Sequence, residues 1–280
     1  MSGPPPITSA VITAKLQSCK AWTNKSFDSF VSSPETGSKA AAFREFRQAW
    51  DATLPVVLGT PSTTTTDNVN KTNDWIERLY KLHSADPARH YHTAVHLQEM
   101  LEYLHVVVDD LHLVSLTRSQ QAAVVLSIYF HDAIYNPQSG TNEEDSEQLW
   151  QEFVKDMRLV NNNKAIIEQV SQFILATKTH QTSLHDANSN PALVLFLDLD
   201  LAVLAKEPSA YLSYAALIRR EYHFVPSDRY CAKRAQILQD FLPMHDCLYG
   251  TPGLQEVWEE QARSNLRHEI IMLQNGVIPS

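Results

Sequence analysis

The sequence predicts an all-α fold, and three observations support this prediction. Glycine, which destabilises helices, is scarce, with only 7 residues in a chain of 280. From about residue 73 onwards, apolar residues recur at helical spacing over long stretches. The alternating patterns typical of strands are almost absent. The short apolar run Leu193–Leu197 is a segment that periodicity alone does not assign to helix or strand.

The first 72 residues are expected to form an N-terminal extension. Its expected elements are a disordered tail over 1–8 and two helices, over about Ser9–Val31 and Lys39–Ala52. The stretch between Pro55 and Asn70 contains four consecutive threonines and no periodicity. We therefore expect it to be a loop or linker.

Residues 73–280 are expected to form the main helical domain. One amphipathic stripe begins at Leu97 and continues to Val108, and a second runs from Ala122 to Tyr129. Apolar stripes of this kind indicate helices that pack one face against a core. Further helices are expected at about 143–157, 164–179, 192–204, 209–222, 229–241 and 255–275.

Composition limits the classes of function. A formal charge of −9 argues against a general binder of nucleic acids or anionic membranes. No apolar run reaches the roughly 18 residues that span a bilayer, and the first residues lack the pattern of a secretory signal. Three scattered cysteines suggest a reducing compartment, so we expect a cytoplasmic protein.

Two of the twelve histidines, His92 and His96, are spaced as i and i+4. On a helix this spacing places both side chains on one face, where they can bind one cation. No glutamate follows the first histidine, so the metalloprotease pattern is absent. On its own the pair is equally compatible with ordinary helix positions.

The dipeptide His131-Asp132 is a stronger signal. It follows the apolar segment Ala122–Phe130, where burying two polar side chains without partners would cost several kcal/mol. A metal ion is one possible partner, and a salt bridge at a helix terminus is the other. Consecutive residues point about 100° apart on a helix, so both reach one ion only where the helix ends. Pro137 just downstream makes such an end plausible.

Two further carboxylates, Asp198 and Asp200, interrupt the apolar run Phe196–Leu201. They would lie on opposite faces of a strand or about 200° apart around a helix. One of them could cap a helix or form a salt bridge. Two in so apolar a segment suggest a metal ligand and a residue that supports the ligands.

Together these features resemble the HD superfamily. In that superfamily a first histidine on a helix is followed by His-Asp at the end of an apolar helix and then by a distant aspartate. The chain is most similar to the bacterial and fungal family described as predicted metal-dependent HD phosphohydrolases. The similarity covers about residues 73–272, whereas residues 1–72 are longer than expected for that family. The similar stretches are 89–96, 129–135, 142–146, 177–180, 197–202, 218–222 and 262–266.

The resemblance implies an HD-type helical bundle that binds a divalent cation. The implied ligands are His96, His131, Asp132 and Asp200. Asp198 would support these ligands without contacting the cation itself. Asp198 and Asp200 could also exchange these two roles. The residues implied to border the site, where they would bind a second ion or transfer protons, are His92, Glu143 and His180.

Arg89, Lys178 and Arg219 are the residues expected to hold a phosphate group through charge-assisted hydrogen bonds. For Arg219 the alternative is an ion-pair network on a helix surface with its neighbours Arg220 and Glu221. Glu143 is expected to act as general base or to orient water. It could equally be a carboxylate that complements the dipole of a helix starting near residue 143.

The activity implied is metal-dependent hydrolysis of a small phosphorylated substrate, a nucleotide or phosphoester, with Glu143, His180 and Asp132 taking part in catalysis. The ligand types suit Mn²⁺, Fe²⁺, Co²⁺, Ni²⁺ or Zn²⁺, and two histidines argue against Mg²⁺ as the only native ion. One alternative is a di-iron oxygenase of the HD fold, which would use extra histidines. A second is a non-catalytic module that binds a nucleotide. We expect neither a nucleic-acid polymer nor a membrane as partner, and the oligomeric state stays open.

Overall fold

The computed structural model describes residues 7–19, 36–58, 66–159, 163–180, 190–244 and 247–280. All regular secondary structure in these ranges is helical, which confirms the all-α prediction and assigns Leu193–Leu197 to a helix. The helices are α1 (Ser9–Gln17), α3 (Thr36–Leu58), α4 (Thr66–Ser84), α5 (Ala94–His105), α6 (Arg118–Phe130), α7 (Asn142–Asp156), α8 (Lys164–Ala176), α10 (Pro191–Asp200), α11 (Pro208–Glu221), α12 (Ser227–Met244) and α13 (Pro252–Gln274). A π-helical segment, η2 (Val106–Asp110), continues α5, and a 3₁₀ segment, η3 (Leu201–Ala205), continues α10.

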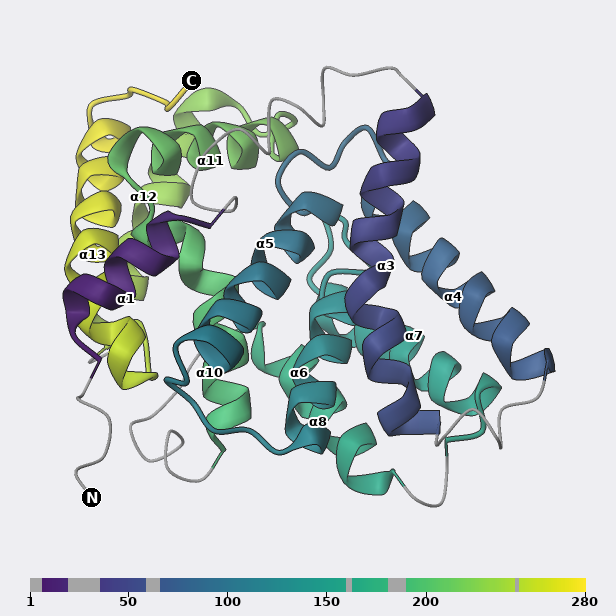
Figure 1. The fold of residues 1–280 in the computed structure, drawn as a ribbon. Coiled ribbons are helices and arrows are strands. Elements are labelled where there is room, and N and C mark those ends of the chain that lie inside the picture. The colour runs from purple at the N-terminus through teal and green to yellow at the C-terminus, as the bar shows by residue number, and fades with distance from the viewer. Residues whose placement is uncertain (1–6, 20–35, 59–65, 160–162, 181–189, 245–246) are drawn as a thin grey trace, which may run out of the picture.

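Helices α5, α6 and α10 pack against one another in the middle of the molecule (Figure 1). On one side α3 lies against both α5 and α6, while α4 packs on α3 and α5. On the other side α11, α12 and α13 form a second group, with α1 lying across α13. The central position of α6 explains its sequence, because residues 122–130 are all buried and a helix surrounded by others has no polar face.

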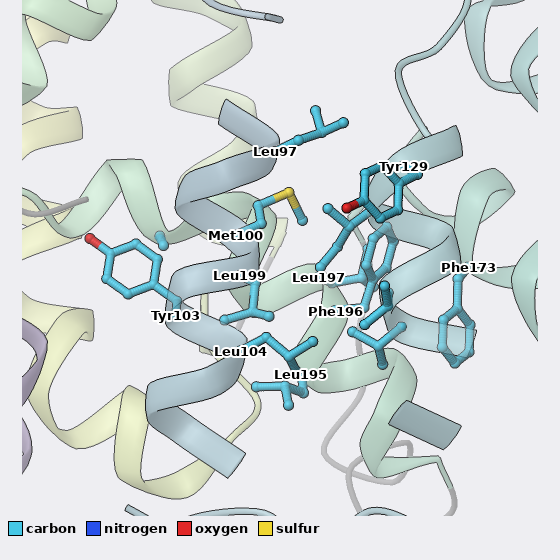
Figure 2. Close-up of a cluster of buried hydrophobic side chains, with 14 of the residues drawn as sticks. Leu97, Met100, Tyr103, Leu104, Tyr129, Phe173, Leu195, Phe196, Leu197 and Leu199 are labelled. Atoms are coloured by element: carbon cyan, nitrogen blue, oxygen red, sulfur yellow. The ribbon is translucent and has the colours of Figure 1, made fainter. Parts of the chain in front are cut away.

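The apolar core fills the space between the three central helices. Figure 2 shows Leu97, Met100 and Leu104 of α5 beside the apolar side chains of α10, among them Leu195 and Leu199. All five of these side chains are almost completely buried. The core therefore fixes the relative positions of α5, α6 and α10.

The beginnings of these three helices are specified locally. The side chain of Thr93 accepts a hydrogen bond from the Val95 N–H at the start of α5. Thr117 and Gln120 form a capping box at the start of α6. Asn190 caps α10, whose first residue is Pro191. Such caps satisfy backbone N–H groups that have no partner within the helix, and so define where each helix begins.

The prediction of a loop between residues 55 and 70 is wrong at both ends, because helices extend into this stretch from either side. Helix α3 continues to Leu58, and α4 already begins at Thr66, so the boundary expected at residue 72 falls inside a helix. Asp67 complements the dipole in the first turn of α4, and the polar start of the helix leads to buried residues such as Ile76. Residues 59–65 lie outside the described ranges, as do residues 1–6 of the expected tail and most of the expected helix after Gln17.

Helix α3 belongs to the same core as the helices that follow it. Its Phe46 and Trp50 are fully buried, and their rings pack against those of Tyr129 and Phe153. The Tyr129 hydroxyl also donates a hydrogen bond to the Phe46 carbonyl. Residues 36–58 therefore complete the hydrophobic core that residues 73–280 were expected to form alone.

None of the helices in the described ranges combines the length and the apolar character that crossing a bilayer requires.

Candidate metal centre

Three of the predicted ligands come together in space. His96 lies in the first turn of α5, and His131 and Asp132 follow the last residue of α6. One possible ligand atom from each of the three lies within 4.8 Å of the other two. Since nitrogen and oxygen ligands lie about 2.0–2.2 Å from an ion such as Zn²⁺, one cation can contact all three.

Asp200, the last residue of α10, brings the fourth predicted ligand to the same place. Its Oδ1 lies 2.9 Å from His96 Nε2 and 3.6 Å from His131 Nε2. Its Oδ2 lies 2.8 Å from His180 Nε2. The Asp200 carboxylate is thus the group at which three histidines from different parts of the chain meet.

The end of α6 explains how two consecutive residues reach one site. The helix stops at Phe130, and the Ala133 N–H returns to the Phe130 carbonyl in a turn. His131 and Asp132 lie in this turn. His131 Nε2 and Asp132 Oδ2 are 3.2 Å apart.

His131 has the geometry of a metal ligand. Its Nδ1–H donates to the Ile128 carbonyl over 3.0 Å, so Nε2 is the nitrogen that faces the cluster and can offer a lone pair to a cation once its own proton has left. Nε2 is buried and makes no hydrogen bond to any of the described residues, although Asp132 Oδ2 lies 3.2 Å away and Asp200 Oδ1 lies 3.6 Å away. An unpaired buried polar atom is costly, and a cation bound by Nε2 would supply the missing interaction. The donor set, two imidazoles and two carboxylates, therefore fits a divalent transition metal.

Electrostatics in the cluster favour a cation. Burial alone lowers the pKa of His131, but the charges of Asp132 and Asp200 raise it well above the usual value. Burial alone raises the pKa of each aspartate, yet His131 keeps both below their usual range. Both carboxylates are therefore ionised at neutral pH, and they lie in a buried site where their charges are weakly screened.

His180 lies four residues after Ala176, the last residue of α8, and has a positive φ of 50°. Its N–H donates to the Ala176 carbonyl, which holds the residue in this left-handed conformation. The imidazole is thereby directed at Asp200. The residue expected to border the site is in contact with a predicted ligand.

His92 does not share a helical face with His96, as its spacing suggested. Helix α5 begins at Ala94, and the extended Thr93 that caps it separates His92 from the helix. The two imidazole rings are nevertheless neighbours, with centroids 6.4 Å apart. His92 Nδ1–H donates to Glu221 over 2.7 Å, and its ring stacks on Tyr135. Burial alone lowers the pKa of His92, but the charge of Glu221 raises it above its usual value.

Glu221 is a supporting residue that sequence reasoning missed. The alternative considered for Arg219 placed Glu221 in a surface network with Arg219 and Arg220, but Glu221 is 1% exposed. Its Oε1 accepts hydrogen bonds from three successive backbone N–H groups, those of residues 90–92, and its Oε2 accepts from the Tyr135 hydroxyl. The available signal was its spacing, because Glu221 continues the buried stripe of α11 three residues after Ile218.

Arg89 holds two segments of the site together. Its guanidinium donates to the carbonyls of His92 at 3.1 Å, Asp132 at 2.7 Å and Ala133 at 2.9 Å. The side chain is largely buried. Arg89 thus binds main-chain oxygens, and this geometry does not support its predicted role in binding phosphate.

Lys178 and Arg219 also have partners outside the metal cluster. Lys178 donates to the Gly140 carbonyl and forms an ion pair with Glu144. Arg219 donates to the Tyr222 carbonyl over 2.7 Å, and its guanidinium lies over the Tyr230 ring. Neither side chain is directed at the four predicted ligands. The predicted role in binding phosphate would require this orientation.

Asp198 supports the fold on the other side of α10. It is 1% exposed, and its carboxylate accepts hydrogen bonds from the Gly250 and Thr251 N–H groups, 2.9 and 2.7 Å away, just before α13. Residues two apart on a helix point in nearly opposite directions. Asp198 and Asp200 therefore do not exchange roles, and the option of Asp198 as an additional ligand is not supported by its position.

Glu143 is in the first turn of α7, where it complements the helix dipole. Its two acidic neighbours have partners: Glu144 pairs with Lys178, and Asp145 accepts from Thr141. The half-exposed Glu143 makes no hydrogen bond or ion pair with another described residue. Its carboxylate is thus available to water or to a ligand.

His83 lies behind Arg89 as a buried, neutral histidine. Its Nε2–H donates to the Tyr129 carbonyl over 3.2 Å, and its Nδ1 lies 3.4 Å from the Arg89 guanidinium. Burial, together with the charge of Arg89, lowers the pKa of His83 to about 3. His83 is thus a buried packing residue.

We expect His83 to make the protein sensitive to acid. Its folded pKa is about 3, whereas the unfolded value is about 6.5. The unfolded chain therefore binds one more proton between these values, and the stability that neutral His83 contributes is lost as the pH falls from about 6.5 towards 3. The stability advantage of the wild type over His83→Gln should shrink by up to about 1.4 kcal/mol per pH unit below pH 6. Urea unfolding at several pH values measures this, and an advantage that does not change with pH would contradict a neutral His83.

A groove of about 740 Å³ lies beside the cluster, between α4 and the turn that follows α6. It is bordered by Arg89, Ala133 and Tyr135, which support the site, but by none of the four predicted ligands. The groove and the metal cluster are thus adjacent features that share a wall.

Comparison of the chain with the known protein families, with curated proteins and with solved structures found no match.

Proposed function

We propose that the protein is a metal-dependent phosphohydrolase that acts on a small phosphorylated substrate, a nucleotide or phosphoester. The observation that supports this most is the convergence of His96, His131, Asp132 and Asp200 from three helix termini. The resemblance of these residues and their order to HD phosphohydrolases suggests the chemistry. The charge of −9 suits a small substrate better than a nucleic-acid polymer.

Mn²⁺, Fe²⁺, Co²⁺, Ni²⁺ and Zn²⁺ suit this donor set better than Mg²⁺, which prefers oxygen ligands. When bound, such an ion lowers the pKa of a water molecule and neutralises charge on phosphoryl oxygens. The three cysteines are free thiols, which is compatible with the cytoplasmic location that we propose.

The remaining roles fall to side chains around the four ligands. His180 and Asp132 are suited to holding and passing a proton, since His180 Nε2 already contacts Asp200. In our proposal the phosphate group is bound by His92 and not by Arg89, Lys178 or Arg219. The raised pKa of His92 favours an imidazolium that can donate a hydrogen bond to a phosphate oxygen, with Glu221 fixing its orientation.

The test is a screen of the purified protein against nucleotides and phosphoesters in the presence of Mn²⁺, Co²⁺, Ni²⁺, Zn²⁺ or Mg²⁺. We expect release of phosphate or of a phosphorylated fragment with at least one transition metal, and loss of this activity with a chelator. Binding of metal and nucleotide without any product would instead indicate a non-catalytic binding module.

Glu143→Gln is expected to lower turnover by about a hundredfold, because a general base or water-orienting group contributes on this scale. Metal content and melting temperature should stay as in the wild type. Glu144→Gln, next to it but paired with Lys178, is the matched control and should keep its activity. A Glu143→Gln protein that hydrolyses normally but melts at a lower temperature would leave Glu143 with only a helix-dipole role.

A di-iron oxygenase is the second candidate, and one observation favours it. The two oxygens of Asp200 face different histidines, with Oδ1 near His96 and Oδ2 near His180. A carboxylate placed in this way can bridge two ions. Electron paramagnetic resonance of the iron-loaded protein distinguishes the candidates, because a mixed-valent di-iron signal without phosphatase activity would favour the oxygenase.

A further inference from the structure

Tyr91 contacts His96 at the nitrogen that faces away from the ligand cluster. The Tyr91 hydroxyl lies 3.1 Å from His96 Nδ1, while His96 Nε2 lies 2.9 Å from Asp200. Each nitrogen of this imidazole therefore has its own partner. The Tyr91 ring is 4% exposed, which makes this a buried contact.

The hydroxyl is held in place from two sides. The Tyr91 N–H donates to Glu221 over 2.7 Å, which fixes the backbone. The ring packs edge-on against Tyr214, with centroids 4.6 Å apart, and lies 4.8 Å from the His96 ring. Tyr91 is thus fixed independently of its contact with His96.

The two candidate histidine ligands have partners of different chemistry. His131 Nδ1 faces the Ile128 carbonyl, which can only accept, so its proton stays on Nδ1. His96 Nδ1 faces a hydroxyl, which can donate or accept. The proton on His131 Nδ1 is therefore fixed, whereas the proton of His96 can move between its two nitrogens without loss of the hydrogen bond to Tyr91.

We propose that Tyr91 is the positioning residue of His96, and that its hydroxyl allows this histidine to exchange tautomers when a cation binds. Without a cation, His96 donates from Nε2 to Asp200 and accepts at Nδ1 from the Tyr91 hydroxyl. When Nε2 binds a cation, its proton leaves to solvent and Nδ1 gains one, which it donates to the Tyr91 oxygen. The overall proton count of the imidazole is unchanged. This inference rests on the metal site of the proposed function, but not on its substrate.

The first test is Co²⁺ binding to the full chain, measured by visible absorption and by competition with a chelator. Tyr91→Phe keeps the ring but leaves the Nδ1–H of the metal-bound imidazole without a partner. We expect it to weaken Co²⁺ binding by about 10–100-fold, the usual effect of removing a residue that orients a ligand. Tyr214→Phe, the same change in the neighbouring ring, should leave Co²⁺ affinity unchanged.

The outcomes separate this inference from the proposed function. A wild-type protein that binds no Co²⁺ would overturn both. Equal Co²⁺ affinity of the wild type and Tyr91→Phe would overturn the role of Tyr91 and leave the metal site intact. Equal weakening by Tyr91→Phe and Tyr214→Phe would show a general effect of packing and would also overturn it.

A second measurement needs no variant. Long-range ¹H–¹⁵N spectra of the wild-type imidazoles report which nitrogen carries the proton. We expect the proton of His96 to be on Nε2 in the metal-free protein and on Nδ1 after addition of Zn²⁺. A proton on Nδ1 in both states would contradict the exchange.

Discussion

Replacing His131 with Ala is expected to weaken divalent-cation binding by more than about a hundredfold, since loss of a ligand should exceed the 10–100-fold effect of losing its supporting residue. His131 is 1% exposed, and its Nε2 is a buried nitrogen that lacks a hydrogen-bond partner among the described residues. Without it, Asp132 and Asp200 would face each other without the imidazole that lies between them. Elemental analysis after dialysis against Co²⁺ or Zn²⁺, together with activity, measures the effect.

Two further variants make this result interpretable. Asp132→Asn changes the volume of the side chain little, so a comparable loss of metal with an unchanged melting temperature would separate ligand loss from unfolding. His105→Ala removes an exposed histidine that pairs with Asp109 on the surface, and it should keep its metal. Full metal content in His131→Ala and Asp132→Asn would refute the assignment of the site.

Trp50→Ala is expected to lower the free energy of unfolding by about 3–5 kcal/mol, the usual cost of truncating a buried tryptophan. Trp50 is fully buried, and its ring packs against Tyr129, Phe130 and Phe153. Its indole N–H has no partner in the part of the chain that the structure describes, so the loss would come from packing. Urea unfolding measures the difference.

Val56→Ala provides the control for Trp50, because Val56 lies on α3 as well but is 37% exposed. We expect it to change stability by less than about 0.5 kcal/mol, as is usual for surface positions. A cost below about 1 kcal/mol for Trp50→Ala would show that α3 contributes little to the core, since buried tryptophans normally cost several times more.

The sequence predicted those features that local signals specify. An apolar segment that ends in His131-Asp132 indicated the end of α6, and the helix does end there. The all-α class followed from the same periodicity, which depends only on neighbours along the chain. Thr93 is a good capping residue, and its position just after His92 indicated that a helix begins between His92 and His96. The prediction gave more weight to the i and i+4 spacing of the two histidines and therefore placed them on one helix.

The partners of the supporting residues could not be predicted in this way. Arg89 and Glu221 are charged residues, which are almost never buried unless they are paired, and their partners are main-chain groups brought close by folding. Main-chain carbonyls and amides leave no trace in the amino-acid sequence. The same holds for Asp198, whose backbone partners lie at the start of α13.

The contacts of Glu221 also affect the order in which the chain folds. This carboxylate accepts the N–H groups of residues that precede it by 131, 130 and 129 positions. Contacts of such large sequence separation form slowly, because a long loop must close before they contribute to stability. During synthesis, the segment that carries His92 emerges well before its partner. The segment around His92 and His96 therefore reaches its final geometry only after α11 has been made, so that the candidate metal centre is completed late in folding.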